Sequence, residues 1–184
     1  MRKCTVFNNV TLDGYFTDAK GDMSWAHKND PEWTAFTREN AKGSCVMVFG
    51  RITYEMMAGW WPSPQAKQMM PAVADSMNNA EKLVFSRTLV RATWSNTRLV
   101  KDDLPGTIRK MKEGKGPALL IMGSGSIIAQ LAQENLIDEY QLALAPVVLG
   151  QGRTMFEGVK NKLDFKLTES RAFSNGNVFL RYTR

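Results

Sequence analysis

The chain of 184 residues carries a formal net charge of +6, with 43% hydrophobic and 23% charged residues. This is the composition of an average globular protein, and it excludes a disordered or fibrous chain. The length supports one hydrophobic core and is too short for two ordinary domains, so we expect a single domain over residues 1–184. No apolar run approaches the roughly 20 residues that span a bilayer, and residues 1–3 lead directly into a strand-like segment. We therefore expect a cytoplasmic protein without a membrane partner.

The charged and metal-binding residue types narrow the class of ligand. The positive charge favours an anionic ligand such as a phosphate, although a solvated surface accounts for it equally well. Lys and Arg are dispersed without a recognition motif, so no nucleic-acid partner is expected. Cys4 and Cys45 lie in apolar, strand-like runs, which favours buried free thiols over a disulfide. His27 is the single histidine and no Cys pair stands at ligand spacing, so no metal site is expected.

Short runs of apolar and β-branched residues alternate with helix-like stretches along most of the chain. The predicted strands are Lys3–Asn8, Cys45–Phe49, Lys82–Ser86, Arg98–Lys101, Ala118–Met122 and Glu139–Val148. The predicted helices are Pro31–Lys42, Arg51–Met57, Ala66–Met77, Leu104–Glu113 and Ser126–Glu134. This alternation implies right-handed crossovers and a largely parallel sheet, hence an α/β fold. At the end of the chain, Leu163–Phe173 and Val178–Tyr182 flank an Asn-Gly turn and predict an antiparallel hairpin that closes the sheet.

The first chemical motif is the apolar strand Val46–Phe49, which runs through Gly50 straight into a helix that begins at Arg51. A helix amino terminus offers unpaired N–H groups and about half a positive charge, which stabilise a phosphate. Arg51 adds a permanent cation whose hydrogen bond to a phosphate is worth about 1.5–3 kcal/mol, so it is a candidate for selecting NADPH over NADH. Thr53 is a candidate ligand of the pyrophosphate. The same residues also fit an ordinary first helical turn.

The second motif follows the strand at Lys82–Ser86. Ser86, Arg87 and Thr88 place hydroxyl groups and a cation just beyond that strand. Open parallel sheets bind their ligands at such strand ends.

The third motif is the apolar strand Ala118–Met122, which leads through Gly123, Ser124 and Gly125 into a helix. Small residues let a backbone approach a pyrophosphate closely. The motif is not the Gly-x-Gly-x-x-Gly fingerprint, because Ile128 stands at the third glycine position, so a standard Rossmann fold is disfavoured. A tight turn capped by one of its serines is the alternative interpretation.

Together these three segments resemble the dihydrofolate-reductase superfamily. The run Gly50-Arg51-x-Thr53-Tyr54-Glu55 is similar to the helix start that binds the phosphates of the cofactor, and Gly123–Ile127 is similar to the later glycine turn. The resemblance implies a three-layer α/β fold with a mostly parallel central sheet, NADPH as the cofactor, and contact of Ser86 and Arg87 with the adenosine 2′-phosphate. The cofactor-binding residues that we predict on this basis are Val10, Gly50, Arg51, Thr53, Tyr54, Ser86, Arg87, Thr88, Gly123, Ser124, Gly125, Ser126 and Ile127.

Three further segments, Thr11–Gly14, Leu136–Tyr140 and Pro146–Gly152, resemble the reductase domain of riboflavin biosynthesis, which is the RibD carboxy-terminal domain, and its stand-alone relatives. The resemblance implies reduction of the pyrimidine intermediate 5-amino-6-(5-phosphoribosylamino)uracil, although this chain has no segment like the companion deaminase domain. The last two segments fit a sheet end or a dimer contact, and we expect a homodimer.

Two acids compete for the position of the carboxylate that pterin-reducing members hold between a Trp and a Phe. Counting forward from Trp25 selects Asp30, whereas counting back from Phe36 selects Glu32. Either is a candidate catalytic residue that assists protonation of the substrate, and either also fits an ordinary helix-start acid. Water is an alternative proton donor.

The substrate-binding residues are predicted from ring chemistry and from the resemblance. Aromatic faces give planar heterocycles contact area and stacking, and the turn after the first strand is expected beside the nicotinamide. That turn also fits a plain Asx turn. The predicted substrate contacts are Asp13, Trp25, Phe36, Trp60 and Trp61.

The sequence thus predicts hydride transfer from NADPH to a small heterocyclic substrate, with the cofactor supplying the chemistry and the protein supplying orientation. A dihydrofolate or pterin reductase is one alternative, and it depends on Asp30 or Glu32. A nucleotide-binding protein without turnover is another.

Overall fold

The computed structural model describes residues 1–26, 30–40 and 43–184. In this part of the chain, an eight-stranded sheet with the strand order β5-β4-β3-β6-β1-β7-β10-β9 forms the centre of the molecule. Its strands are β1 (Cys4–Thr11), β3 (Cys45–Gly50), β4 (Glu81–Phe85), β5 (Thr97–Val100), β6 (Ala118–Met122), β7 (Glu139–Ala145), β9 (Lys166–Ala172) and β10 (Val178–Thr183). A separate two-stranded sheet consists of β2 (Tyr15–Thr17) and β8 (Arg153–Thr154).

The strands from β5 to β7 run parallel. β1 pairs in parallel with β6 and β7, β3 pairs with β4 and β6, and β4 pairs with β5. β10 runs antiparallel to both β7 and β9, and the turn between β9 and β10 holds Gly176 at a φ of 84°. The mostly parallel sheet closed by a C-terminal antiparallel hairpin is therefore confirmed.

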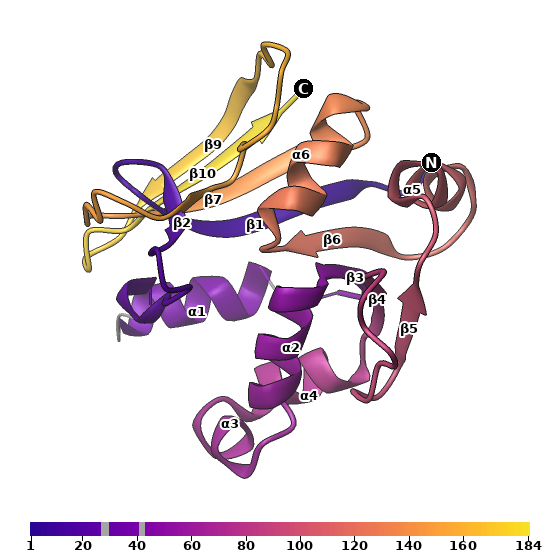
Figure 1. Cartoon of the computed structure of the whole chain (residues 1–184). Coiled ribbons are helices and arrows are strands. Elements are labelled where there is room, and N and C mark those ends of the chain that lie inside the picture. The colour runs from indigo at the N-terminus through magenta and orange to yellow at the C-terminus, as the bar shows by residue number, and fades with distance from the viewer. Residues whose placement is uncertain (27–29, 41–42) are drawn as a thin grey trace.

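Helices cover both faces of this sheet and give the three layers that were predicted (Figure 1). They are α1 (Pro31–Asn40), α2 (Arg51–Trp60), α3 (Pro64–Met69), α4 (Pro71–Asn79), α5 (Leu104–Glu113) and α6 (Gly125–Gln133), with a short 3-10 helix at Ser24–Ala26. Successive side chains of a strand point to opposite faces. Val46 and Val48 of β3 accordingly pack with α5 and α6, whereas Met47 and Phe49 pack with α2 and α4.

Two predicted element boundaries are wrong, and a proline explains each. The single helix predicted for Ala66–Met77 is two helices, because Pro71 has no N–H to continue the ladder and Met70 before it is not helical (φ −141°, ψ 61°). The strand predicted for Glu139–Val148 ends at Ala145, because Pro146 cannot donate to a neighbouring strand.

Other boundaries differ by a few residues at the ends of correctly predicted elements. The first strand continues from Asn8 to Thr11, and the helix that begins at Arg51 continues to Trp60. The last two residues of the helix predicted for Pro31–Lys42 lie outside the described residues, as does His27.

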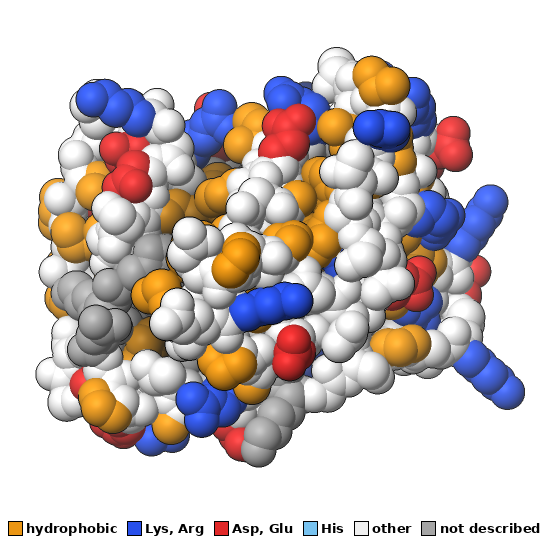
Figure 2. Space-filling model, turned by 90° about the horizontal axis from the view of Figure 1, so that it is seen from below, with side chains coloured by type: hydrophobic (Ala, Val, Ile, Leu, Met, Phe, Trp, Pro, Cys, Tyr) orange, Lys and Arg blue, Asp and Glu red, His pale blue; other side chains and the backbone are white. Residues whose placement is uncertain are grey.

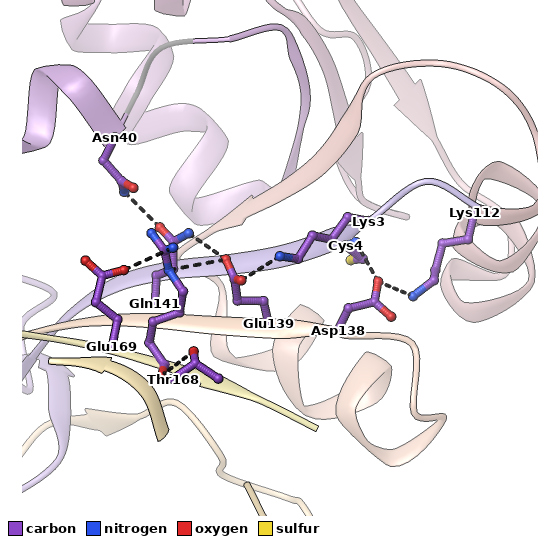
Figure 3. A network of polar contacts seen from close by, with 10 residues as sticks. Lys3, Cys4, Asn40, Lys112, Asp138, Glu139, Gln141, Thr168 and Glu169 are labelled. Carbon is purple, nitrogen blue, oxygen red and sulfur yellow. Dashed lines mark hydrogen bonds and ion pairs between the residues drawn. The ribbon is translucent and has the colours of Figure 1, made fainter. Parts of the chain in front are cut away.

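A polar network joins the amino-terminal ends of β1 and β7 (Figure 3). The ammonium group of Lys112 on α5 donates to the carboxylate of Asp138, which also accepts from the backbone N–H of Cys4 at 2.8 Å. Lys3 forms an ion pair with Glu139 at 2.6 Å. Burial raises the pKa of the Cys4 thiol to about 12. The network therefore fixes the register of β1 and β7 at their amino-terminal ends.

Cys4 is buried and Cys45 is half-buried, and both are free thiols. Across the described ranges, no helix combines the length and the apolar character needed to cross a membrane. In the same ranges, His, Cys, Asp and Glu side chains do not gather in groups of three that would hold a metal ion.

Candidate functional site

A cleft of about 1080 Å³ opens along the carboxyl ends of the parallel strands. The segments after β5, β4, β3, β6 and β1 line it, so it crosses four strand intervals in the order of the sheet. Neighbouring strands lie about 4.8 Å apart, which gives the cleft a length of roughly 19 Å. Such a cleft suits an extended ligand with several groups better than a single ring, and it lies where open parallel sheets bind ligands.

The turn between β3 and α2 forms the middle of the cleft. Gly50 is extended (φ −84°, ψ 167°), and no side chain of the described residues caps the helix that follows. The N–H groups of the first turn of α2 therefore remain available to a ligand. A Cβ on Gly50 would lie 2.9 Å from the Oγ of Ser124, so a larger residue at this position would force the Ser124 side chain to move.

The turn between β6 and α6 lies beside it. Gly123 and Ser124 adopt left-handed conformations with φ of 65° and 59° before α6 begins at Gly125. A Cβ on Gly123 would lie 3.0 Å from the Thr53 side chain, and one on Gly125 would lie 3.1 Å from the carbonyl oxygen of Thr154. Two helix amino termini thus meet through small residues, and the backbone of both turns lines the cleft.

Ser124 connects these two turns. The backbone N–H of Gly50 donates to the Oγ of Ser124 at 2.8 Å, and the hydroxyl of Ser124 donates to the Oγ1 of Thr53 at 2.9 Å. A left-handed conformation costs a non-glycine residue roughly 1 kcal/mol, which two hydrogen bonds offset. The Ser124 side chain does not cap its own helix among the described residues. It instead holds the amino terminus of α2 against that of α6.

Cationic side chains stand along the cleft. Arg87 after β4, Lys101 after β5 and Arg153 on β8 line it, and none of them forms an ion pair within the described residues. Arg51 pairs with Glu55 at 2.9 Å, but both side chains are nearly half exposed (44% and 47%). An exposed pair of this kind is worth about 0–1 kcal/mol, so a phosphate competes with it readily. Figure 2 shows Lys and Arg side chains scattered singly among hydrophobic and uncharged ones on the face seen from below.

The structure brings most of the predicted cofactor residues together in this cleft. Ser86 shapes the loop after β4, since its Oγ accepts from the backbone N–H groups of Thr88 and Leu89. Val10 and Tyr54 are buried in the core and do not line the cleft. The predicted cofactor residues that line it are Gly50, Arg51, Thr53, Ser86, Arg87, Thr88, Gly123, Ser124, Gly125, Ser126 and Ile127.

The two candidate acids tie α1 to the C-terminal hairpin, and neither lines the cleft. Asp30 accepts from the backbone N–H of Trp33 at 2.6 Å and from the hydroxyl of Ser174 at 2.8 Å. These two hydrogen bonds lower the pKa of the Asp30 carboxyl, the bond from Trp33 contributing most. Glu32 forms an ion pair with Arg171 at 2.8 Å.

Asp13 joins two loops. Its carboxylate accepts from the hydroxyl of Thr11 and from the backbone N–H groups of Leu149 and Gly150, the last at 2.7 Å. The hydrogen bond from Thr11 is the main cause of a lowered pKa at Asp13, and those from Gly150 and Leu149 add to it. Asp13 does not line the cleft, and it holds the turn after β1 against the loop before β8.

The four predicted substrate aromatics lie elsewhere in the structure. Trp25 is half-buried within the short 3-10 helix, and Phe36 packs edge-on to Phe179 with ring centroids 4.7 Å apart. Trp60 is 41% exposed at the end of α2, and Trp61 packs with the core of α2 and α4. None of these four side chains lines the cleft, so their contact with substrate stays a prediction.

Several cleft residues carry no signal that sequence reasoning could use. The sequence pattern indicates nothing more than strand residues at Asn8 and Asn9. It likewise indicates nothing more than solvated surface cations at Lys101 and Arg153. Asn8 and Asn9 reach the cleft because β1 lies next to β6, Lys101 because β5 pairs with β4, and Arg153 because β8 folds back on β2.

Comparison with known proteins agrees with this architecture. Residues 2–179 match the model of a family described as the RibD C-terminal domain. YyaP of Bacillus subtilis is 26% identical over 174 residues, covering 94% of this chain and 90% of YyaP. YwjB of the same organism is 22% identical over 183 residues, covering 100% of this chain and 98% of YwjB. Both relatives are uncharacterized proteins.

Solved structures share the fold. A Shewanella sp. PV-4 protein, named provisionally for riboflavin biosynthesis, has a TM-score of 0.75 at 24% identity, over 99% of this chain and 98% of its own. The Thermotoga maritima diaminohydroxyphosphoribosylaminopyrimidine deaminase/5-amino-6-(5-phosphoribosylamino)uracil reductase has a TM-score of 0.71 at 15% identity, over 99% of this chain and 56% of its own. A pyrimidine reductase-like protein of Corynebacterium diphtheriae has a TM-score of 0.67 at 12% identity, over 99% of this chain and 91% of its own. These likenesses confirm the predicted dihydrofolate-reductase-like fold.

Proposed function

The chain belongs to the RibD C-terminal domain family, and from this premise we propose that it is an NADPH-dependent reductase that transfers a hydride to a small heterocyclic substrate. The observation that carries the proposal is the meeting of two glycine turns, each at an uncapped helix amino terminus, in the middle of an elongated cleft. A dinucleotide has two linked phosphates near its centre, and this arrangement suits them.

The residues of the cleft fit NADPH along its length. The backbone N–H groups at the starts of α2 and α6 would hold the pyrophosphate together, because glycine at positions 50, 123 and 125 lets the two turns pack closely against their neighbours. Arg87 would hold the adenosine 2′-phosphate, with Ser86 and Thr88 beside it. When bound, NADPH supplies the hydride.

The protein supplies position and a dry surface. Phe16 is buried beside the first turn of α6, and Ile127 is buried within that turn, so both present apolar surface to the cleft. Excluding water from the reacting groups strengthens electrostatic interactions within the site. Asp30 and Glu32 do not line the cleft, so we propose that solvent delivers the proton that completes the reduction.

For the substrate we propose a ribosylated pyrimidine of the kind that the Thermotoga maritima enzyme is named for, 5-amino-6-(5-phosphoribosylamino)uracil. The support is family membership together with an open cleft that is long enough for a second ligand beside the cofactor.

Two measurements on the purified protein test the proposal. Calorimetric titration with NADPH and with NADH should show binding, with NADPH preferred. Loss of NADPH absorbance should then require the pyrimidine substrate. Absence of NADPH binding would overturn the cofactor assignment, whereas binding without turnover on pyrimidines would overturn the substrate.

A further inference from the structure

Asn8 lies on β1 at the end of the cleft farthest from β5, and only 5% of its surface is exposed. Its Oδ1 accepts a hydrogen bond from the backbone N–H of Gly123 at 2.7 Å. Since an N–H needs an acceptor, this bond fixes which end of the side-chain amide carries the oxygen. The Nδ2 donor of Asn8 is then buried and has no hydrogen-bond partner among the described residues.

A buried amide donor without a partner is unusual, because the group has lost its hydrogen bonds to water and gained none in return. Five other side chains in the described ranges hold such an atom, and none of them lines the cleft. Asn8 is therefore singled out by two independent observations, its unpartnered donor and its place beside the start of α6.

The position of Asn8 along the cleft indicates which part of a ligand it meets. Groups suited to phosphates lie after β4, β3 and β6, with Arg87 and Arg51 among them. The cleft residues of β1 are instead uncharged, and Phe7 and Asn9 stand on either side of Asn8. A dinucleotide whose phosphates occupy the middle of the cleft would bring its uncharged redox ring to the β1 end.

We propose that Asn8 binds the nicotinamide ring of the cofactor, with its Nδ2 donating a hydrogen bond to the carbonyl oxygen of the carboxamide. This inference rests on the proposed function, because it needs NADPH in the cleft. Since Oδ1 is held by Gly123, the same side chain links the orientation of the ring to the turn that receives the phosphates. Asn8 is a binding residue that sets which face of the ring is presented.

The test compares three ligands by calorimetric titration. They are NADP⁺, thio-NADP⁺, in which sulfur replaces the carboxamide oxygen, and 2′,5′-ADP, which has no nicotinamide. The variants are Asn8→Asp, which keeps the acceptor for Gly123 and removes the donor, and the neutral Asn8→Ser, which guards against an effect of added charge. Asn40→Asp is the matched control, because Asn40, at the end of α1 and away from the cleft, donates to Gln141 on β7.

We expect the wild-type protein to prefer NADP⁺ to thio-NADP⁺, and both Asn8 variants to lose that preference with about tenfold weaker NADP⁺ binding. Binding of 2′,5′-ADP should weaken much less than that of NADP⁺ in Asn8→Ser, where Gly123 loses its acceptor but no contact to the nicotinamide is at stake. Asn40→Asp should match the wild type for all three ligands. Equal weakening of NADP⁺ and 2′,5′-ADP binding in Asn8→Ser would show that Asn8 only supports the turn at Gly123. Unchanged NADP⁺ binding in both Asn8 variants would show that Asn8 makes no hydrogen bond to the nicotinamide. Either result overturns the inference and leaves the proposed function standing. A wild-type protein that binds neither NADP⁺ nor 2′,5′-ADP overturns both.

Discussion

The hydroxyl group of Ser124 donates to the hydroxyl group of Thr53 at 2.9 Å, which joins residues that are 71 positions apart in the chain. Ser124 also accepts from the backbone N–H of Gly50, so the starts of α2 and α6 are held as one unit. Two sets of helix N–H groups thereby keep a fixed spacing. A pyrophosphate that contacts both sets meets a preorganised site, which lowers the cost of binding.

Replacing Ser124 with Ala should weaken NADPH binding about tenfold, because two hydrogen bonds are lost and the N–H of Gly50 is left without its acceptor. Ser124→Gly should weaken it similarly while unfolding less readily than Ser124→Ala, since glycine tolerates a φ of 59°. Calorimetry and urea denaturation measure the two effects. The exposed Ser44→Ala is the control. Equal NADPH affinity in Ser124→Ala and wild type would contradict the role given to this side chain.

Arg87→Ala should weaken NADPH about tenfold or more and leave NADH nearly unchanged, because only NADPH carries the 2′-phosphate. Arg51→Ala should show the same direction with a smaller loss, since Arg51 is already paired with Glu55. Arg91→Ala, an exposed cation outside the cleft, serves as the control. The measurement is the ratio of the two dissociation constants. Equal losses of affinity for NADPH and NADH in Arg87→Ala would contradict the assignment of Arg87 to the 2′-phosphate.

Asp30→Asn and Glu32→Gln should leave turnover unchanged, because both acids contact the hairpin and neither lines the cleft. A fall in the rate with dihydrofolate in either variant would instead support the pterin alternative.

Asp30→Asn should lower the free energy of unfolding at neutral pH, where the Asp30 carboxylate is charged. The pKa of Asp30 is lowered in the fold, so its charged form stabilises the protein above the ordinary aspartate pKa, and this contribution disappears as the pH falls through the lowered value. The urea midpoints of variant and wild type should therefore converge in acid.

Lys82→Met should lower the free energy of unfolding by about 3 kcal/mol at neutral pH. The buried ammonium group of Lys82 donates to the carbonyl oxygens of Met77, Asn78 and Ala80 at the end of α4. In the variant the oxygens of Met77 and Ala80 would lose this donor, whereas that of Asn78 keeps its hydrogen bonds from Ser95 and Asn96. Urea denaturation by circular dichroism measures the loss. A variant as stable as the wild type would contradict this account.

The same lysine predicts a pH dependence. Burial lowers the pKa of Lys82 from 10.5 to about 8. Between these two values the unfolded chain binds more protons at this position than the folded chain, so the Lys82 contribution to stability should rise with pH in that range. Subtracting the pH profile of Lys82→Met from that of the wild type leaves the contribution of Lys82 together with its electrostatic coupling to Cys45. A difference that falls between pH 8 and 10.5 would contradict the direction.

The parts of the fold that sequence reasoning predicted are those set by local chemistry. Gly50 and Gly123 end apolar strands and begin helices, and both turns lie in the cleft as expected. Asn175-Gly176 forms the hairpin turn because glycine adopts a positive φ without strain. Local rules also explain the break at Pro71, which the apolar pattern across it had concealed.

The remaining parts of the candidate site depend on which strands become neighbours. The Asn8–Gly123 bond exists because β6 lies against β1, and Arg153 reaches the cleft because β8 pairs with β2. No residue type in Lys3–Asn8 indicates these partners. The carboxylates of Asp13 and Asp30 likewise have obvious local uses in turns and caps, and only the tertiary structure shows that each also reaches a distant loop.

The place of β1 within the sheet has a consequence for the folding pathway. β1 precedes the other strands of the sheet in chain order, yet its partners are β6 and β7. Its pairing with Leu119 and Leu120 joins residues more than 110 positions apart. Contacts of such long sequence separation slow folding, because a long loop must close before any pairing energy is gained. Until β6 and β7 are made, the apolar edges of β1 need protection from other chains. The cleft is therefore a late product of folding, because its β1 side is in place only after β1 has paired with β6.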